Sequence, residues 1–478
     1  MDSKIESFIR RYVAAIDEND AAIFAGAGLS RASGMVDWKN LLRGIAQELG
    51  LDVNKEHDLI ALAQYYKNEK GGRHELNQEI LNQFTGGVNI NENHKILASL
   101  PIKTYWTTNY DFLIEQSLQQ CDKIPHVIKD PVSLTYTVRK DAIIYKMHGD
   151  AAEPEKAVIT KDDYENYNET RQLFTIALKG DLVSKTFLFI GFSFDDPNLE
   201  YILSRIRILL GENTRTHYCF FKRVIECDFS GHDDYIYEKT KQELKIKDLL
   251  RYKIEALLVD DYSEITEVLR IIQKRIKARN VFISGAVEVF NTWNRSNTET
   301  FVNALTKKLI SNNYSIFCGF GVNIGSSVIN SVLELEKETN LKVDDNLILK
   351  PFPQNIENAD DRKTKWHEYR VRMISNTGIS IFIFGNKVQD GSCIISDGVI
   401  KEFEISHSLG NLIIPIGSTG SAALEIWTQI DKEFDTYFPK ASPTLKEQFM
   451  LFNRRLDVKE TIDNILNFIT EAKRLHII

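Results

Sequence analysis

A short apolar segment that ends in closely spaced glycines limits most strongly how this chain can fold. The segment is AAIFAGAGLS, residues 21–30. Residues 22–25 are typical of a buried strand, and Gly26 and Gly28 can turn the chain sharply and expose backbone N–H groups to phosphate oxygens. A dinucleotide fingerprint would place a third glycine where this chain has Arg31. The segment therefore predicts either a site for a nucleotide diphosphate or simply a tight strand-to-helix turn.

The composition is that of an ordinary globular protein. A chain of 478 residues is long enough for two domains, and 43% hydrophobic and 26% charged residues leave no sign of low complexity. The net charge of -8 argues against general binding of nucleic acid or of anionic membranes. No apolar run reaches about 18 residues, and the first residues carry charges at helical spacing. We therefore expect a cytoplasmic protein with neither nucleic acid nor membrane as a partner.

The cysteines do not form metal-binding or disulfide patterns. None of the five belongs to a CxxC pair, so we expect no zinc site, no disulfide framework, and free thiols in the core. They are Cys121, Cys219, Cys227, Cys318 and Cys393.

The first half of the chain predicts a parallel sheet with a helical insertion. Residues 2–18 have apolar side chains on one face of a helix. Residues 38–49, 59–66 and 76–84 predict three further amphipathic helices with no strand between them. We interpret these three as an inserted helical subdomain.

Small or polar residues follow four predicted strands of this half. They are Gly26 after residues 22–25, Asn109 after 102–106, His148 after 143–146, and Gly191 and Ser193 after 186–190. In open parallel sheets, ligands bind at the carboxyl ends of the strands, so these residues can share one crevice. A lone histidine in such a place can also be a core or capping residue.

The second half repeats the alternation of strand and helix. A polar run at residues 274–279 precedes residues 281–285, which again read as a strand ending in glycine. We place the boundary there, which gives domains of residues 1–278 and 279–478. The predicted fold class is α/β, with two doubly wound, Rossmann-like parallel-sheet domains, the first carrying the helical subdomain.

Motifs in the first half resemble the sirtuin family. They occur in the family's order, as GAGLS at 26–30, GMVDW at 34–38, TTNYD at 107–111, MHGD at 147–150 and GFSFDDPNL at 191–199. The resemblance implies an NAD site. By that resemblance Gly26, Ala27, Gly28 and Ser30 bind the pyrophosphate side, Asp111 meets the nicotinamide amide, Ser193 and Asn198 hold the adenosine side, Asn109 orients the ribose hydroxyl or a water, and His148 is the general base.

Departures from the sirtuin pattern point to water as the acceptor. Sirtuin deacylases use a zinc module with two CxxC pairs, which this chain lacks. Lys39 stands where sirtuins usually have an arginine, and residues 38–86 show no features for binding an acyl-lysine peptide. We therefore expect hydrolysis of NAD to ADP-ribose and nicotinamide, with no metal and no cofactor beyond NAD as the substrate. An NAD-dependent protein deacylase and a non-catalytic nucleotide-binding scaffold are the alternatives.

The second half resembles the SLOG family, the sensor relatives of phosphoribohydrolases. The matching segments are residues 284–285, 319–326 and 398–402. The prolyl-diglycine of the enzymes' PGGxGTxxE loop is absent, which favours binding over hydrolysis and disfavours a phosphoribohydrolase. Residues predicted to bind the activator are Gly285, Gly319, Gly321, Arg370, Lys387 and Glu402. Arginine and lysine suit phosphate and glutamate suits ribose hydroxyls, although each of these three can also be an ordinary surface or paired residue.

Together the two halves resemble the effectors of the Thoeris antiphage system. That resemblance implies a partner protein with a TIR domain that makes a cyclic ADP-ribose isomer, binding of this isomer to the SLOG domain, and destruction of cellular NAD. It also implies a homo-oligomer, for which a tetramer is one expectation, and the helices at 2–18 and 38–86 could supply the interfaces.

Overall fold

The computed structural model describes residues 2–136, 138–194, 196–211, 213–339, 346–350 and 358–478, and it divides into two compact units. These are residues 1–273 and 274–478, so the division falls inside the helix α14 (Ser263–Lys277), a few residues before residue 278. Each unit is described by itself.

A seven-stranded parallel sheet forms the centre of the first unit. The strand order is β3-β4-β2-β1-β5-β6-β7. The strands are β1 (Ala21–Ala25), β2 (Thr104–Thr107), β3 (Pro125–Ile128), β4 (Ala142–Lys146), β5 (Thr186–Ile190), β6 (His217–Lys222) and β7 (Ile254–Val259). The wholly buried β1 lies between β2 and β5. The chain thus continues to opposite sides of β1, which makes its carboxyl end the point where a ligand crevice forms in such sheets.

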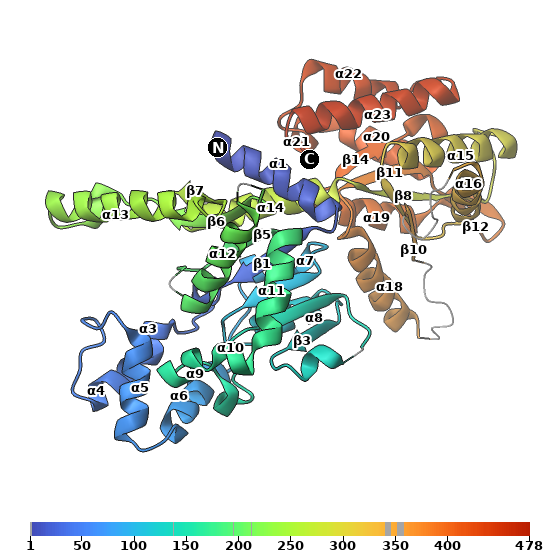
Figure 1. Cartoon of the computed structure of the whole chain (residues 1–478). Helices are drawn as coiled ribbons and strands as arrows, with labels where there is room; N and C mark the ends of the chain where they lie inside the picture. Colours follow the sequence, from blue (N-terminus) through green and yellow to red (C-terminus); the bar gives the residue numbers. More distant parts are fainter. Residues whose placement is uncertain (1, 137, 195, 212, 340–345, 351–357) are drawn as a thin grey trace. The chain divides into compact units, whose positions relative to one another are not determined.

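Helices cover this sheet. They are α1 (Ser3–Asp17), α2 (Ala27–Arg31), α7 (Glu92–Ser99), α8 (Leu113–Gln120), α9 (Lys161–Glu165), α10 (Tyr167–Thr170), α11 (Gln172–Ser184), α12 (Pro197–Leu210) and α13 (His232–Leu250), followed by α14. Apolar residues of α11 and α12 pack on Phe24, Phe187 and Phe189 of the sheet, and Figure 1 shows these two helices in front of it. The long helix α13 extends away from the sheet (Figure 1).

The apolar stripe of α1 is used within this chain. Ile5, Phe8, Ile9 and Ile16 are buried, and the Tyr12 hydroxyl donates to the carbonyl of Ala22 at 2.9 Å. The apolar stripe of this helix therefore packs on its own unit, and the expectation that the helix supplies an interface to another copy stays a prediction.

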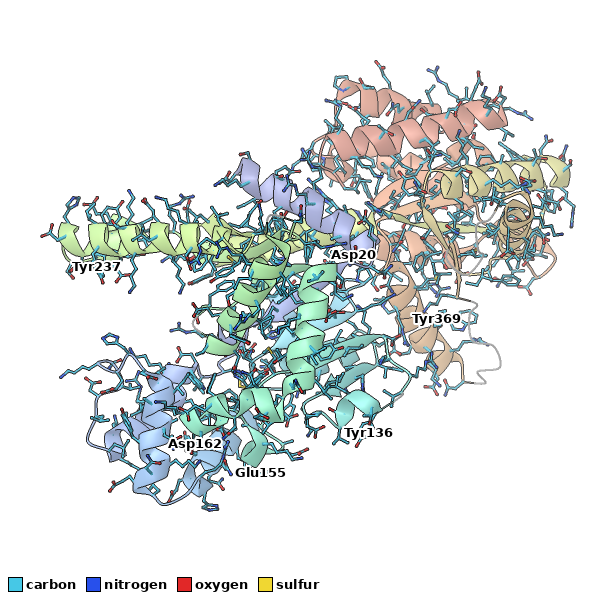
Figure 2. The ribbon with its side chains drawn as sticks, viewed as in Figure 1. Asp20, Tyr136, Glu155, Asp162, Tyr237 and Tyr369 are labelled. Carbon is cyan, nitrogen blue, oxygen red and sulfur yellow. The ribbon has the colours of Figure 1, made fainter. Side chains whose placement is uncertain are left out.

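The predicted helical insertion is present. It contains α3 (Trp38–Leu41), α4 (Arg43–Glu48), α5 (Leu59–Glu69) and α6 (His74–Phe84), whose apolar faces share one core with Tyr110, Leu113 and Ile159 of the main part of the unit. Two ion pairs bind it to α9 of the main unit: Lys67 Nζ lies 2.7 Å from Asp162, and Arg73 lies 2.9 Å from Asp163. Asp162 is labelled in Figure 2. The apolar face of residues 38–86 is thus also occupied within the chain.

The second unit contains a five-stranded parallel sheet in the order β10-β9-β8-β11-β14. The strands are β8 (Asn280–Ala286), β9 (Ser315–Cys318), β10 (Leu347–Leu349), β11 (Ile379–Phe384) and β14 (Leu412–Pro415). The helices include α15 (Arg295–Ser311), α16 (Ile324–Glu338), α18 (Ala359–Ile374), α19 (Asp397–Ser408), α20 (Ser421–Lys432), α21 (Phe434–Tyr437), α22 (Pro443–Leu451) and α23 (Val458–Arg474). An antiparallel hairpin of β12 (Asn386–Gln389) and β13 (Ser392–Ile395) stands apart from the sheet. The predicted fold class, with two Rossmann-like domains, is confirmed.

The cysteines only partly follow the expectation. All five are free thiols, and Cys219 and Cys318 are buried. Cys227 and Cys393 are exposed, so the prediction of core thiols was wrong for these two. Among the described residues, no helix has the length and apolar character needed to cross a membrane.

Candidate active site

Asn109 joins the loop after β2 to the glycine loop after β1. Its side-chain amide donates to the carbonyl of Gly26 at 3.1 Å and contacts the hydroxyl of Ser30 at 3.3 Å. Its backbone N–H donates to the Thr107 hydroxyl at 2.9 Å, which fixes the turn that carries it. The structure therefore brings together three of the predicted site residues, and Asn109 and Ser30 are both buried.

The glycines of this loop pack against the backbone after β5. A Cβ on Gly28 would lie 2.8 Å from the Cα of Gly191, and one on Gly191 would lie 2.0 Å from the backbone nitrogen of Leu29. The N–H groups of Gly26 and Gly28 donate to the carbonyls of Ile190 and Gly191, each at 2.9 Å. The expectation that these N–H groups are bare was therefore wrong. Glycine is needed here because two backbones approach closely, and the residue between the two glycines, Ala27, begins α2.

His148 follows β4 and lies beside a carboxylate that sequence reasoning did not identify. Its Nε2 nitrogen lies 3.1 Å from Oδ2 of Asp196, and the two side chains are only 5% and 9% exposed. The ring of Tyr164 meets the imidazole edge-on, with centroids 5.5 Å apart. The buried imidazole is thus held between an aromatic ring and an acid.

Asp196 also caps α12, because its Oδ1 accepts from the N–H of Leu199 at 3.0 Å. Burial raises the pKa of Asp196, but the His148 imidazole and the nearby backbone N–H groups outweigh burial, and the pKa ends below its usual value. An aspartate directly before Pro197 was the available signal, and it indicated only a helix start.

The adenosine-side candidates lie in the same segment as Asp196. Ser193 is exposed, and Asn198 is half-buried, with a buried side-chain nitrogen that has no hydrogen-bond partner among the residues that the structure describes. Asp195, part of the GFSFDDPNL motif, lies outside the described residues.

Asp111 is buried at the start of α8, where its Oδ1 accepts from the N–H of Leu113 at 3.0 Å. Lys146, wholly buried at the end of β4, donates to the carbonyl of Asp111 at 2.5 Å and to Glu115 at 2.9 Å. Burial raises the pKa of Glu115, and the Lys146 ammonium opposes this rise. The Lys146–Glu115 pair therefore holds the loop that carries both Asn109 and Asp111, and sequence reasoning missed it.

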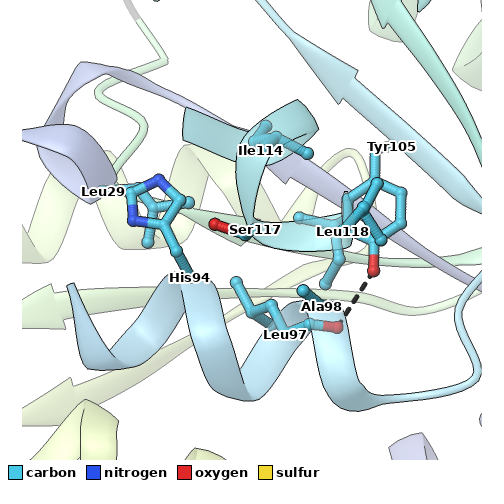
Figure 3. A pocket seen from close by; sticks show the side chains of 9 residues that line it. Leu29, His94, Leu97, Ala98, Tyr105, Ile114, Ser117 and Leu118 are labelled. Atoms are coloured by element: carbon cyan, nitrogen blue, oxygen red, sulfur yellow. Dashed lines mark hydrogen bonds between the residues drawn. The ribbon is translucent and has the colours of Figure 1, made fainter. Parts of the chain in front are cut away.

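A small cavity of about 10 Å³ lies between α7, α8 and the glycine loop (Figure 3). His94 lines it together with Leu29 and Ser117, and both ring nitrogens of His94 are buried without a hydrogen-bond partner in the described part of the chain. Burial lowers the pKa of His94 to about 4, although the Asp111 carboxylate opposes this shift. The imidazole is therefore neutral near pH 7.

In the second unit, Arg370 and Glu402 form the centre of the predicted activator site. Both are buried, and Arg370 Nε lies 3.5 Å from Glu402 Oε1. The Ser284 hydroxyl, at the end of β8, donates to the other carboxylate oxygen at 2.6 Å. Burial raises the pKa of Glu402, opposed by Ser284 and Arg370. A Cβ on Gly398 would lie 3.3 Å from the Arg370 guanidinium, so the first turn of α19 lies directly against it.

The other activator-site candidates lie at two separate places in the second unit. Lys387, on β12, pairs with Asp397 at the start of α19. Gly285 and Gly321 meet backbone to backbone, since a Cβ on Gly321 would lie 2.0 Å from the Gly285 carbonyl, and Gly319 follows β9. Nowhere among the described residues is a group of three or more histidine, cysteine, aspartate or glutamate side chains arranged to hold a metal ion.

Comparison with known proteins covers both units. Residues 103–247 match the SIR2-like domain, and residues 264–472 match the Sir2- and TIR-associating SLOG family. The chain is 46% identical to the NAD(+) hydrolase ThsA of Bacillus cereus (strain MSX-D12), over 98% of each protein. It is 45% identical to the protein of that name from Acinetobacter baumannii (strain 532279), over 94% of this chain and 95% of the relative, and 44% identical to the one from Cytobacillus dafuensis, over 98% and 97%. The chain belongs to the ThsA family.

Membership of the ThsA family confirms the resemblance to Thoeris effectors that the motifs indicated. The SIR2-like match includes Asn109, His148 and Asp196, and the SLOG match includes Arg370 and Glu402.

Proposed function

We propose that the first unit hydrolyses NAD+ to ADP-ribose and nicotinamide. The observations that carry the proposal are the buried contact of His148 with Asp196 after β4 and the contact of Asn109, after the neighbouring strand β2, with the glycine loop. The near full-length similarity to proteins named NAD(+) hydrolases supports the same reaction.

The roles of the site residues follow from their chemistry. Cleavage of the nicotinamide bond needs little help at the leaving group, which is already cationic, but it needs stabilisation of the developing oxocarbenium centre and a base for the attacking water. His148 is that base, and Asn109 orients the water or the ribose hydroxyl. Asp111 binds the nicotinamide amide.

The remaining contacts to NAD come from two loops. Gly26, Ala27, Gly28 and Ser30 lie against the pyrophosphate; with the glycine N–H groups engaged by β5, the loop contributes its compact backbone and the start of α2. Ser193 and Asn198 bind the adenosine side, where the buried amide nitrogen of Asn198 offers a donor. We propose that NAD enters as the substrate and that the reaction uses neither zinc nor another cofactor.

The second unit is proposed to bind a cyclic ADP-ribose isomer that activates hydrolysis. Arg370 and Lys387 contact the phosphates, Glu402 accepts ribose hydroxyls, and Gly285, Gly319 and Gly321 let the backbone approach. A partner with a TIR domain supplies this isomer during phage infection. Because uncontrolled loss of NAD would kill the host cell, a second site that shifts the population toward an active state fits this role.

The same proposal includes the domain boundaries, the location in the cell and the oligomeric state of the protein. The NAD-hydrolysing domain is residues 1–278 and the sensing domain is residues 279–478. The protein acts in the cytoplasm as a homo-oligomer, with a tetramer as one expectation.

The test is to incubate the full-length protein with NAD+ and each of several cyclic ADP-ribose isomers, and to measure nicotinamide and ADP-ribose by liquid chromatography and mass spectrometry. We expect both products in equal amounts, with the rate raised by one isomer. A parallel incubation contains an acetyl-lysine peptide. Deacetylation of the peptide with NAD otherwise intact would overturn the proposal, and so would intact NAD under every condition.

A further inference from the structure

Asp196 faces His148 from a different element of the fold. His148 follows β4, whereas Asp196 precedes α12, and the 3.1 Å contact joins them with both side chains almost wholly buried. At this distance the carboxylate forms an ion pair with the imidazole whenever the ring takes up a proton. Inside a protein such a pair is stronger than in water, because little solvent screens it.

The carboxylate is itself held in place. Oδ1 accepts from the N–H of Leu199 at 3.0 Å, and the Tyr164 hydroxyl lies 3.5 Å from Oδ2. The imidazole in turn packs edge-on against Tyr164 and Tyr167, at centroid distances of 5.5 and 6.3 Å. Orientation of the ring is therefore set jointly by a fixed acid and two aromatic walls.

Asp196 is the carboxylate that contacts the imidazole, and its pKa lies below its usual value. Burial raises the pKa of the hydroxyls of Tyr110, Tyr164 and Tyr167, so these three neighbours stay uncharged. The guanidinium of Arg171 lies beyond Gly149 and is bound to the carbonyls of Lys129 and Lys156.

We propose that Asp196 is a positioning residue for the reaction: it fixes the His148 ring and stabilises the imidazolium that forms during hydrolysis. The inference rests on the proposed function. In the step concerned, the water oxygen bonds to the anomeric carbon and a water proton passes to His148. The bond to the nicotinamide nitrogen breaks, with its electron pair going to nicotinamide. The positive charge that leaves the sugar and pyridinium thus arrives partly on the imidazole, next to Asp196.

Capping of α12 is the competing role for Asp196, and one substitution separates the two. Asparagine caps helices about as well as aspartate but carries no charge. Asp196→Asn therefore keeps the cap and removes the ion pair, whereas Asp196→Ala removes both. Asp58→Asn is the matched control, because Asp58 caps α5 of the same unit through the N–H of Ala61.

The experiment measures kcat and KM for NAD from pH 5 to pH 9 in the full-length protein, with the activating isomer present, and the thermal unfolding midpoint of each variant. We expect Asp196→Asn to unfold near the wild-type temperature while kcat falls about 10²- to 10⁴-fold with little change in KM. The acid limb of its kcat profile should move to lower pH, because an imidazolium without its carboxylate loses its proton more readily. In a His148→Ala background, Asp196→Asn should add no further loss.

A wild-type kcat and pH profile for Asp196→Asn would overturn this assignment and leave the cap as the role of Asp196. An equal loss in the presence and absence of His148 would also overturn it. Wild-type protein that leaves NAD intact with every isomer is a separate result, which rejects the proposed function and this assignment with it.

Discussion

The sites of the two units share a close approach of two backbone segments at glycine residues, and they differ in the side chains found there. In each, two glycine-containing loops meet where parallel strands end: Gly28 against Gly191 in the first unit, and Gly285 against Gly321 in the second. The loop after β2 in the first unit brings the Asn109 amide to the glycine loop, and the loop after the neighbouring strand β4 pairs the His148 imidazole with the Asp196 carboxylate. The second unit instead places a guanidinium, a carboxylate and a hydroxyl together.

We propose that this difference separates the hydrolytic site of the first unit from the binding site of the second. Histidine changes charge near neutral pH, whereas arginine stays charged and presents fixed donors to phosphate. The fold by itself therefore does not distinguish a hydrolase from a sensor. The side chains after the strands make the distinction, and the comparison can be tested at each of them.

The largest expected effect is on turnover in the first unit. His148→Ala and Asn109→Ala should each lower NAD hydrolysis by at least about 10³-fold with activator present, because the base or the group that orients its target is lost. The rate of nicotinamide release measures this. Residual activity within tenfold of wild type in either variant would place the chemistry elsewhere.

The second-largest effect is expected from removal of the buried Glu402 carboxylate in the second unit. Glu402→Ala removes a partner of the buried Arg370 and of Ser284, so we expect a loss of about 3–5 kcal/mol in the free energy of unfolding. Urea unfolding of the full chain, followed by intrinsic fluorescence, measures the loss. Glu404→Ala, exposed on the same helix, is the control. If both variants unfold alike, the carboxylate does not hold the second site together.

A matched pair of glycine substitutions tests the close backbone approach that the two units share. Gly191→Ala and Gly321→Ala each place a Cβ 2.0 Å from backbone atoms, and we expect each to cost at least about 1–3 kcal/mol of stability. Gly191→Ala should also abolish NAD hydrolysis, while Gly321→Ala should weaken the response to activator. Gly180→Ala, with open space around its Cβ position, should do neither. Equal effects of the two variants on both readouts would contradict the division of roles.

The smallest effect at pH 7 is expected from two buried histidines of the first unit, which alter stability only in acid. Burial lowers the pKa of both His94 and His217 from the ordinary value of about 6.5 to about 4. The unfolded chain therefore binds protons that the folded chain does not. The free energy of unfolding has its full value above pH 6.5. It falls toward pH 4, by about 1 kcal/mol per pH unit for each histidine.

The variants His94→Gln and His217→Gln should flatten this slope in thermal unfolding measured from pH 4 to pH 7. The exposed His57→Gln should leave the slope as it is. A slope that is identical in all three variants would show that other groups cause the loss in acid.

The fold and many of the candidate residues were predictable because strand periodicity and strand-end residues are local patterns. Asn109 and His148 each follow an apolar run, and the glycine loop has a recognisable spacing. Asp196 was missed because a helix cap and an ion-pair partner look alike in sequence. Lys146 and His94 were missed because only tertiary packing shows that a lysine in a strand or a histidine in a helix is buried. The occupied N–H groups of Gly26 and Gly28 depend on the neighbouring strand, which local sequence does not reveal.

The most direct test of the separation between the two sites measures activator binding and turnover in the same two variants. Titration calorimetry with the activating isomer and an assay of NAD loss are applied to His148→Ala and Arg370→Ala. The account predicts that His148→Ala binds the isomer like wild type without consuming NAD, and that Arg370→Ala neither binds it nor responds to it. Loss of isomer binding in His148→Ala, together with normal activation of Arg370→Ala, would contradict the account.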